Sequence, residues 1–210
     1  MDGFKVRKTL LVGAGGHARS IISAAQSIAV DIHGIIDLSY KGQNENILGC
    51  PVVGDLDYLT PLPPDEFCIF LSIGENDLRR KTFHEIRDLG FEFPNIIHEK
   101  SCLDENVSVG IGNFFGAGAY LGPACCAGSF NIINTNSVVE HEVTMGDFNH
   151  VAPSATICGR VSIGDDCLIG ANSAIIDKQT VPDGTIIGAG AVVVKSPHRK
   201  GLTLKGVPAR

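Results

Sequence analysis

The sequence lacks three features that define large classes of proteins. Its seven cysteines are an odd number and include no C-x-x-C pair, which excludes a disulfide framework and a zinc ribbon. No apolar run approaches the ~20 residues of a membrane span, and the start shows no signal-peptide pattern. Positive charge is not in excess, since the formal net charge is −6, which argues against binding along a nucleic-acid backbone. We therefore expect a cytoplasmic globular protein with no nucleic-acid or membrane partner.

The first hundred residues alternate apolar runs with amphipathic segments, which is typical of a small parallel α/β sheet. Residues 39–66 are rich in Gly, Pro, Asn and Asp and are predicted to be loop and short turns. We assign residues 1–100 to an N-terminal domain and residues 101–210 to a second domain. The predicted strands are residues 8–15, 31–38, 67–74 and 93–98, and the predicted helices are residues 17–28 and 76–90.

The turn after the first predicted strand, GAGGHA, fits a phosphate-binding pattern. Gly13, Gly15 and Ala18 match G-x-G-x-x-[G/A] between a strand and a helix. Glycine N–H groups and a helix N-terminus hold phosphate in such turns, and a tight turn without a ligand is the alternative. The few strands that follow are too few for two mononucleotide-binding halves, which favours a nucleotide-sugar over NAD. Asp37 ends the second predicted strand, where such folds carry a ribose-binding acid.

After residue 100 every sixth residue from Leu103 to Val193 is apolar, in sixteen consecutive cases. Chance would produce this run with a probability of about 10⁻⁵, so the segment is a hexapeptide repeat. The next position is glycine in eight units, and we expect this glycine to permit the tight corner. Such repeats build a parallel β-helix of triangular cross-section with about 18 residues in each coil.

The repeat, the ending GVPAR and the start LLVGAGGHARS resemble the bacterial hexapeptide-repeat acetyltransferases that act on nucleotide-linked amino sugars. This family includes the bacillosamine-pathway N-acetyltransferases and the sialic acid O-acetyltransferases. The resemblance covers nearly the whole chain. It implies a small Rossmann-like parallel α/β domain followed by a left-handed parallel β-helix, a homotrimer with active sites between subunits, and acetyl-CoA as donor. It also implies substrate contacts at Gly15, Gly16, His17, Asp37, Leu38, Gly74 and Asp77, and we add Gly13 from its own turn.

The stretch SVVEHEVTMGDFNHVAP, residues 137–153, carries the candidate for chemistry. His141 takes the third position of its unit and should project from a corner, while Val139 and Val143 pack inward. Imidazole titrates near neutral pH and suits a general base, and the adjacent Glu142 would fix its tautomer. The E-H-E sequence matches the family, and an ordinary surface histidine is the alternative. Gly159, one coil later at the same corner, is predicted to offer its N–H to an oxyanion.

The resemblance assigns His150 to the thioester end of acetyl-CoA and Ala171 and Ala189 to further CoA contacts. The two alanines are one coil apart, which suits a long ligand that lies parallel to the helix axis. The C-terminal tail has two open interpretations: its basic side chains either contact the CoA phosphates or are simply solvated. These residues are Lys195, Arg199, Lys200 and Lys205.

Our first hypothesis is an N-acetyltransferase that moves acetyl from acetyl-CoA to the 4-amino group of a nucleotide-linked 4-amino-4,6-dideoxy sugar. His141 and Glu142 would act as the base, and no metal is needed. O-acetylation of a sialic acid is the nearest alternative. A γ-type carbonic anhydrase shares the β-helix and binds zinc through three histidines, but the nine-residue spacing of His141 and His150 and the absence of H-x₄-H argue against it. An inactive nucleotide-sugar binding module is opposed by the intact E-H-E.

Overall fold

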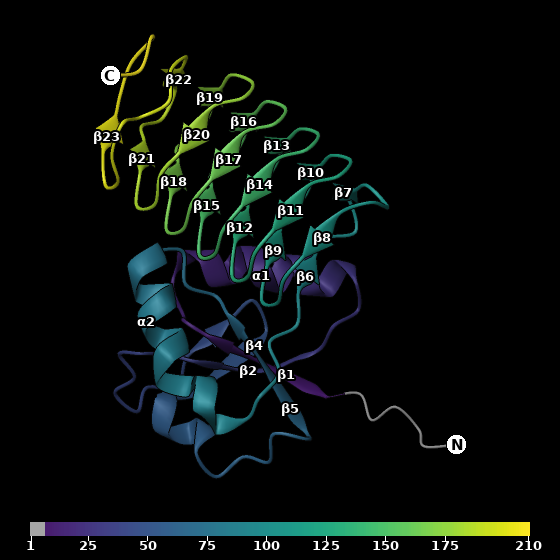
Figure 1. The fold of residues 1–210 in the computed structure, drawn as a ribbon. Helices are drawn as coiled ribbons and strands as arrows, with labels where there is room; N and C mark the ends of the chain where they lie inside the picture. The colour runs from purple at the N-terminus through teal and green to yellow at the C-terminus, as the bar shows by residue number, and fades with distance from the viewer. Residues whose placement is uncertain (1–6) are drawn as a thin grey trace. The chain divides into compact units, whose positions relative to one another are not determined.

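The computed structural model describes residues 7–210, and the chain divides into two compact units, one up to Ile96 and one from Ile97. In the ribbon of Figure 1, the first unit combines a sheet with helices, and the second is a regular stack of coils. Each unit is described by itself below.

The first unit is an α/β domain around a five-stranded sheet of order β3-β4-β2-β1-β5, in which β3 is antiparallel to β4 and the other pairs are parallel. Its core includes Leu10 and Leu11 of β1 and Ile21 and Ile22 of α1, all fully buried. The elements are β1 Lys8–Val12, α1 Gly16–Ser27, β2 Ile32–Ile36, β3 Asn46–Ile47, β4 Cys50–Gly54, η1 Leu56–Leu59, β5 Phe67–Leu71, α2 Asn76–Ile86 and η2 Arg87–Leu89.

Two predictions for this unit are wrong. Residues 39–66, predicted as loop, contain β3, η1 and the parallel strand β4, whose Val52 is buried and pairs with Ile35 of β2. The apolar run of β4 is only a few residues long and contains a proline, so the surrounding turn residues hide its pattern. Residues 93–98 were predicted as a strand of this sheet, but only Ile96–Ile97 form one, β6, and it belongs to a sheet of the β-helix.

The second unit is a parallel β-helix, which confirms the hexapeptide repeat. Each coil contributes one two-residue strand to each of three sheets, and residues 18 apart pair in register, as Leu121 does with Val139. The winding is left-handed, against the general preference for right-handed crossovers. The strands β7–β23 are Cys102–Leu103, Ser108–Val109, Phe114–Phe115, Tyr120–Leu121, Cys126–Ala127, Ile132–Ile133, Val138–Val139, Thr144–Met145, His150–Val151, Thr156–Ile157, Ser162–Ile163, Leu168–Ile169, Ala174–Ile175, Thr180–Val181, Ile186–Ile187, Val192–Val193 and Thr203–Leu204.

The sixth-residue positions form the core of the β-helix. They are the second residues of strands β7 to β22, and all of them are buried except the first two, Leu103 and Val109, which are partly buried. Each of these side chains stacks on the one in the coil before it, so the coils share one continuous apolar column.

The prediction for the corner glycines is wrong in its mechanism. The left-handed backbone conformation occurs two residues later, at the fourth position of every unit from Val109 to Ile187, as at Glu142, Phe148, Ser154 and Arg160, each with φ between 56° and 59°. The glycines at the second position are needed for close approach instead. A Cβ on Gly170 would lie 2.5 Å from the carbonyl oxygen of Ile187 in the next coil.

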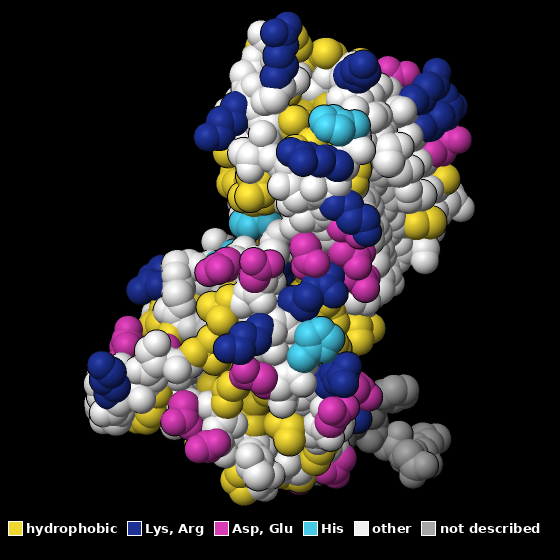
Figure 2. All heavy atoms as spheres, turned by 60° about the vertical axis from the view of Figure 1, so that its left-hand side comes forward, with side chains coloured by type: hydrophobic (Ala, Val, Ile, Leu, Met, Phe, Trp, Pro, Cys, Tyr) yellow, Lys and Arg dark blue, Asp and Glu magenta, His cyan; other side chains and the backbone are white. Residues whose placement is uncertain are grey.

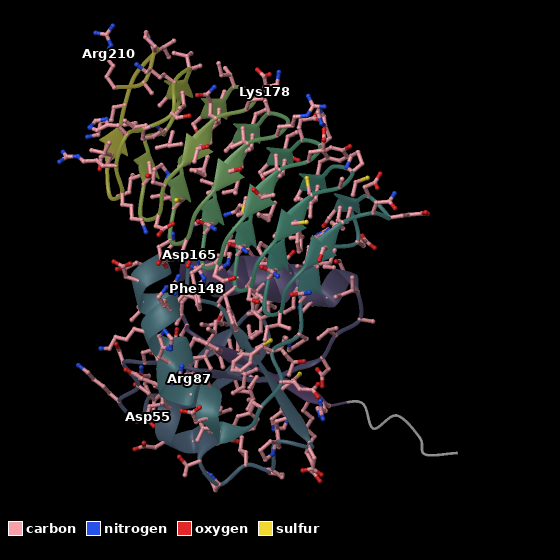
Figure 3. The ribbon with its side chains drawn as sticks, viewed as in Figure 1. Asp55, Arg87, Phe148, Asp165, Lys178 and Arg210 are labelled. Carbon is pink, nitrogen blue, oxygen red and sulfur yellow. The ribbon has the colours of Figure 1, made fainter. Side chains whose placement is uncertain are left out.

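Three kinds of corner result from this geometry. We call the turns at residues 104–107, 122–125, 140–143, 158–161 and 176–179 the histidine corner. The turns at residues 110–113, 128–131, 146–149, 164–167 and 182–185 are the ladder corner, and the remaining turns are the third corner. Figure 3 labels Lys178 at the histidine corner and Phe148 and Asp165 at the ladder corner.

Candidate active site

The α/β unit has a pocket at the carboxyl ends of β1 and β5. The chain runs outward from β1 through β2 to β4 and then returns to the other side of β1 as β5, so this is the switch point where such sheets bind ligands. The pocket has a volume of about 390 Å³. It is lined by Gly13, Ala14, Gly15, Gly16, His17, Asp37, Leu38, Ser39, Ser72, Ile73, Gly74, Glu75 and Leu78.

The glycines of the first turn have different structural roles. Gly13 has a φ of 114°, and a Cβ there would lie 2.7 Å from Cγ1 of Ile73, so both its conformation and its packing require glycine. At Gly15 and Gly16 a Cβ would meet nothing within 4 Å. These two residues therefore leave open space beside the N-terminus of α1, where the backbone can approach an anionic group.

Seven of the eight predicted substrate residues line this one pocket, namely Gly13, Gly15, Gly16, His17, Asp37, Leu38 and Gly74. The eighth, Asp77, lies in the first turn of α2, is exposed and is not part of the lining. Asp37 also stabilises its own turn, because its Oδ1 accepts a hydrogen bond of 3.0 Å from the N–H of Ser39.

Arg79 is a pocket-forming residue that the sequence did not reveal. Its side chain is 1% exposed and donates hydrogen bonds to the carbonyl oxygens of Ile73 and Gly74, at 3.0 and 3.2 Å, and to Oδ1 of Asn76, at 2.8 Å. It thereby fixes the loop between β5 and α2 that forms one wall of the pocket. Nothing in the linear sequence separates this arginine from Arg80 beside it.

In the β-helix, the structure brings His141, Glu142 and Gly159 together. Nδ1 of His141 lies 3.0 Å from Oε2 of Glu142, and the imidazole is 45% exposed. A Cβ on Gly159 would lie 2.5 Å from both Cε1 and Nε2 of His141, so the imidazole covers the bare backbone of the next coil. Val139 and Val143 are buried, whereas His141 and Glu142 project from this turn.

Arg160 is a second residue that sequence analysis missed. Its Nε lies 2.9 Å from the same Oε2 of Glu142, so that one carboxylate oxygen serves both His141 and Arg160. Hydrogen bonds from His141 and then from Arg160 lower the pKa of Glu142 below its ordinary value. The carboxylate is therefore ionised at neutral pH, and the proton of the shared bond resides on Nδ1 of His141. The available signal was spacing, since Arg160 follows Glu142 by one coil of 18 residues.

The residues predicted for acetyl-CoA lie elsewhere on the chain. His150 is in β15, and its Nε2 lies 3.2 Å from Nδ2 of Asn134. Ala171 and Ala189 are at the third corner, in neighbouring coils. Because the sheet that contains β15 is the side of the triangle opposite the histidine corner, one chain does not bring these residues to His141.

The basic residues predicted to contact the CoA phosphates do not form one cluster with the other predicted CoA contacts. Lys195 follows β22 at the end of the histidine corner and is exposed. On the face shown in Figure 2, Lys and Arg side chains lie at several places rather than in one patch.

The thiols and other potential ligands give no second centre. Cys125 is buried and donates to the carbonyl oxygen of Glu140 at 2.9 Å, and burial raises the pKa of its thiol. Within residues 7–210, no group of three His, Cys, Asp or Glu side chains is placed to hold a metal ion. No helix in the same residues is long and apolar enough to cross a membrane.

Together these features define a class: a hexapeptide-repeat transferase with a separate ligand-binding α/β domain. Family models agree, since residues 8–86 match the PglD N-terminal domain and residues 160–194 match the hexapeptide repeat of succinyl-transferase. The chain belongs to the hexapeptide-repeat acetyltransferases that act on nucleotide-linked amino sugars, and it is an acetyl-CoA-dependent sugar N-acetyltransferase.

Solved structures and one curated relative support this placement. Perosamine N-acetyltransferase from Caulobacter crescentus, crystallised as a variant with CoA and GDP-perosamine, is 32% identical over 98% of this chain and 96% of its own, with a TM-score of 0.92. The acetyltransferase domain of PglB from Neisseria gonorrhoeae, in complex with acetyl coenzyme A, is 31% identical over 97% and 98%, with a TM-score of 0.90. An uncharacterised protein of Acanthamoeba polyphaga mimivirus is 32% identical over 123 residues, and the chain spans 24% of its length.

Proposed function

We propose that the protein transfers the acetyl group of acetyl-CoA to the 4-amino group of a nucleotide-linked 4-amino-4,6-dideoxy sugar. The observation that carries the proposal is the hydrogen bond between His141 and the ionised Glu142 at an exposed corner. The likeness to an enzyme crystallised with CoA and GDP-perosamine supports the choice of substrates. The pocket beside Gly15 and Gly16 would hold the nucleotide diphosphate, and Asp37 and Leu38 would face the nucleoside.

In the proposed mechanism His141 acts as the general base. Glu142 accepts a hydrogen bond from the N–H at Nδ1, which leaves the lone pair of Nε2 free to take a proton from the sugar amine as its nitrogen attacks the thioester carbonyl. The tetrahedral intermediate then collapses, the C–S bond breaks, and the imidazolium returns its proton to the CoA sulfur. Two Caulobacter structures have a histidine also numbered 141 replaced, by asparagine and by alanine, and this supports the assignment.

Gly159 is proposed to stabilise the oxyanion of that intermediate. The bare backbone lies under the His141 ring, and a side chain there would displace the base. A backbone N–H directed at the developing charge contributes to catalysis in a site from which water is excluded.

We propose that acetyl-CoA binds between two subunits of a homotrimer. His150, Ala171 and Ala189 lie away from the histidine corner of their own chain, so a neighbouring chain must supply them to His141. The outer faces of the sheets are unequal, since one presents Ser108, Cys126, Thr144, Ser162 and Thr180, whereas the face with His150 presents Leu168 and Ile186. The more apolar face is suited to lie against another subunit.

The test is an acceptor panel. Purified protein would be incubated with acetyl-CoA and with UDP-, dTDP- and GDP-linked 4-amino-4,6-dideoxy sugars, their 4-hydroxy counterparts and a sialic acid, and release of free thiol would be followed. We expect acetylation of an amino sugar linked to one nucleotide and none of its hydroxy counterpart. Acetylation of the sialic acid alone would replace the proposal with O-acetyl transfer.

The subunit arrangement has its own test. Light scattering should give the mass of a trimer at the concentration of the assay. Mixing inactive His141→Ala chains with inactive His150→Ala chains, after dissociation and reassembly, should restore activity, because some interfaces then combine an intact His141 with an intact His150. A fully active monomer would contradict the shared site.

A further inference from the structure

The contact between Arg160 and Glu142 is built into the stacking of the coils. Both residues occupy the fourth position at the histidine corner, with φ of 59° in each, and they are one coil apart. The backbone N–H of Arg160 donates to the carbonyl oxygen of His141 at 3.0 Å, while its Nε donates to Oε2 of Glu142 at 2.9 Å. Arg160 is therefore tied to both members of the pair, once through its backbone and once through its side chain.

We propose that Arg160 is a positioning residue for acetyl transfer. It holds the Glu142 carboxylate where it accepts the hydrogen bond from Nδ1 of His141, and this bond aligns the imidazole as a base. This inference rests on the proposed function. The side chain of Glu142 is 48% exposed, so without a second donor it would sample several rotamers. Nε of Arg160 and Nδ1 of His141 converge on one oxygen and select the rotamer in which the imidazole receives its acceptor. A small loss of such alignment is costly for a reaction that needs close approach.

Arg160 also changes the electrostatic potential at the imidazole of His141. The negative charge of Glu142 favours the imidazolium form, which is inactive as a base, and the guanidinium opposes this effect. On the turns that adjoin Arg160, the other charged residues are Glu140, on the turn of Glu142, and Asp177 and Lys178, on the turn after Arg160. The coil before contributes only Pro123 and Ala124 to the neighbouring positions, so Arg160 is the cation that offsets Glu142 directly.

An exposed ion pair with no function is the competing explanation, since many such pairs contribute little to stability or activity. Lys178 offers a matched control. It occupies the same fourth position one coil further, has a φ of 60°, and pairs with Asp177 at 3.6 Å rather than with Glu142. Figure 3 shows it at this corner.

The experiment compares Arg160→Gln, Arg160→Lys and Lys178→Gln in steady-state assays across pH, all with unbranched side chains that suit the left-handed backbone. For Arg160→Gln we expect kcat to fall about 10-fold with the KM for acetyl-CoA changed less than about twofold. In its pH–rate profile, the midpoint on the acid side should move to higher pH, because the imidazolium is stabilised when the guanidinium is lost. Arg160→Lys should restore the wild-type midpoint of the pH–rate profile but only part of kcat. Lys178→Gln should match the wild type in both kcat and pH profile.

Three results would overturn the inference. Arg160→Gln could leave kcat and the pH profile unchanged, could raise only the KM for acetyl-CoA, which would make Arg160 a ligand contact, or could act no differently from Lys178→Gln. In the His141→Ala background, adding Arg160→Gln should cost little more, because residues that act as one unit are not additive. His141→Ala measured alone separates the two ideas: if that variant keeps wild-type kcat, the proposed function fails, whatever the Arg160 variants show.

Discussion

The ladder corner and the histidine corner share one backbone and use their polar side chains in opposite ways. At the ladder corner, the same residue types recur in consecutive coils, with asparagine in three of them and aspartate in three. Oδ1 of Asp165 accepts from the N–H of Asp147 at 2.9 Å, Oδ1 of Asn131 accepts from the N–H of Asn149 at 2.8 Å, and the rings of Phe130 and Phe148 stack at 5.0 Å. These polar groups satisfy the backbone of the neighbouring coil.

At the histidine corner the third and fourth positions hold a different residue in each coil. The third positions are Glu105, Pro123, His141, Gly159 and Asp177. Glu142 bonds to both His141 and Arg160, and these three side chains remain about half exposed. The comparison teaches that repetition along the coils contributes stability and that departure from repetition marks chemistry. Each prediction below tests whether the two roles can be separated by mutation.

The largest expected effect is at His141. His141→Asn should lower kcat by about 10²–10⁴-fold, because the proton moves to this group in the transition state, and should barely change the thermal midpoint. The control is Asp147→Asn, which changes the third position at the ladder corner and keeps an Oδ1 acceptor, so its kcat should stay within about twofold. Steady-state rates and melting curves check both. A His141→Asn variant with more than half of wild-type kcat would contradict the mechanism.

The next effect distinguishes two glycines. In Gly159→Ala the new Cβ would lie 2.5 Å from Nε2 of His141, and the flexible ring would move, so kcat should fall about 10–100-fold with little loss of stability. In Gly146→Ala the Cβ would collide with Oδ1 of Asp165 and lie 3.0 Å from the backbone of Gly164. That variant should lose about 1–3 kcal/mol of stability and keep its kcat per folded molecule.

These two measurements use the same assays as the first pair. Equal losses of stability in both glycine variants, or a fall in kcat for Gly146→Ala alone, would show that the two corners are not functionally separate.

Asn131 gives a smaller and purely structural effect. It is 1% exposed, its Nδ2 donates to the carbonyl oxygen of Gly146 at 2.9 Å, and its Oδ1 serves Asn149. Asn131→Ala should cost about 1–3 kcal/mol because buried backbone groups lose their partners, while kcat is retained. Urea or thermal unfolding measures the loss, and Ser108→Ala, on the exposed polar face, is the control that should unfold with the wild type.

The sequence predicted the strands of the β-helix because a six-residue period is unbroken from Leu103 to Val193, and burial enforces it. It did not predict which corner position is left-handed, since Glu142, Phe148, Ser154 and Arg160 share no side-chain property. The stacking of identical turns imposes that conformation rather than the residue type. Likewise β4 was missed because a short strand in the sheet draws its stability from Ile35 and its neighbours rather than from its own pattern.

The part of the candidate site that local sequence signals mark was predictable, and the part that depends on three-dimensional contacts was not. A glycine turn and an E-H-E sequence are local signals, and they indicated the pocket turn and His141 with Glu142. Arg79 and Arg160 act through contacts made in three dimensions, with the loop before α2 and with Glu142 respectively. Only the 18-residue coil length connects Arg160 to Glu142 in the sequence, and that length becomes meaningful once the repeat is recognised.

The smallest effect is expected at the last carboxylate of the ladder. The Lys200 ammonium, and then the N–H of Asp165, hold the pKa of Asp183 below its ordinary value. A lowered carboxylate pKa contributes stability above the unfolded pKa, and this contribution is lost as pH falls through the folded pKa. Lys200→Met should therefore lower the thermal midpoint slightly at neutral pH and low salt, and the difference from the wild type should vanish as Asp183 protonates in acid. Melting curves from pH 7 to pH 3, at low and high salt, measure this difference. A loss of stability that persists in acid or in high salt would mean that Lys200 stabilises the corner through packing of its aliphatic stem rather than through its charge.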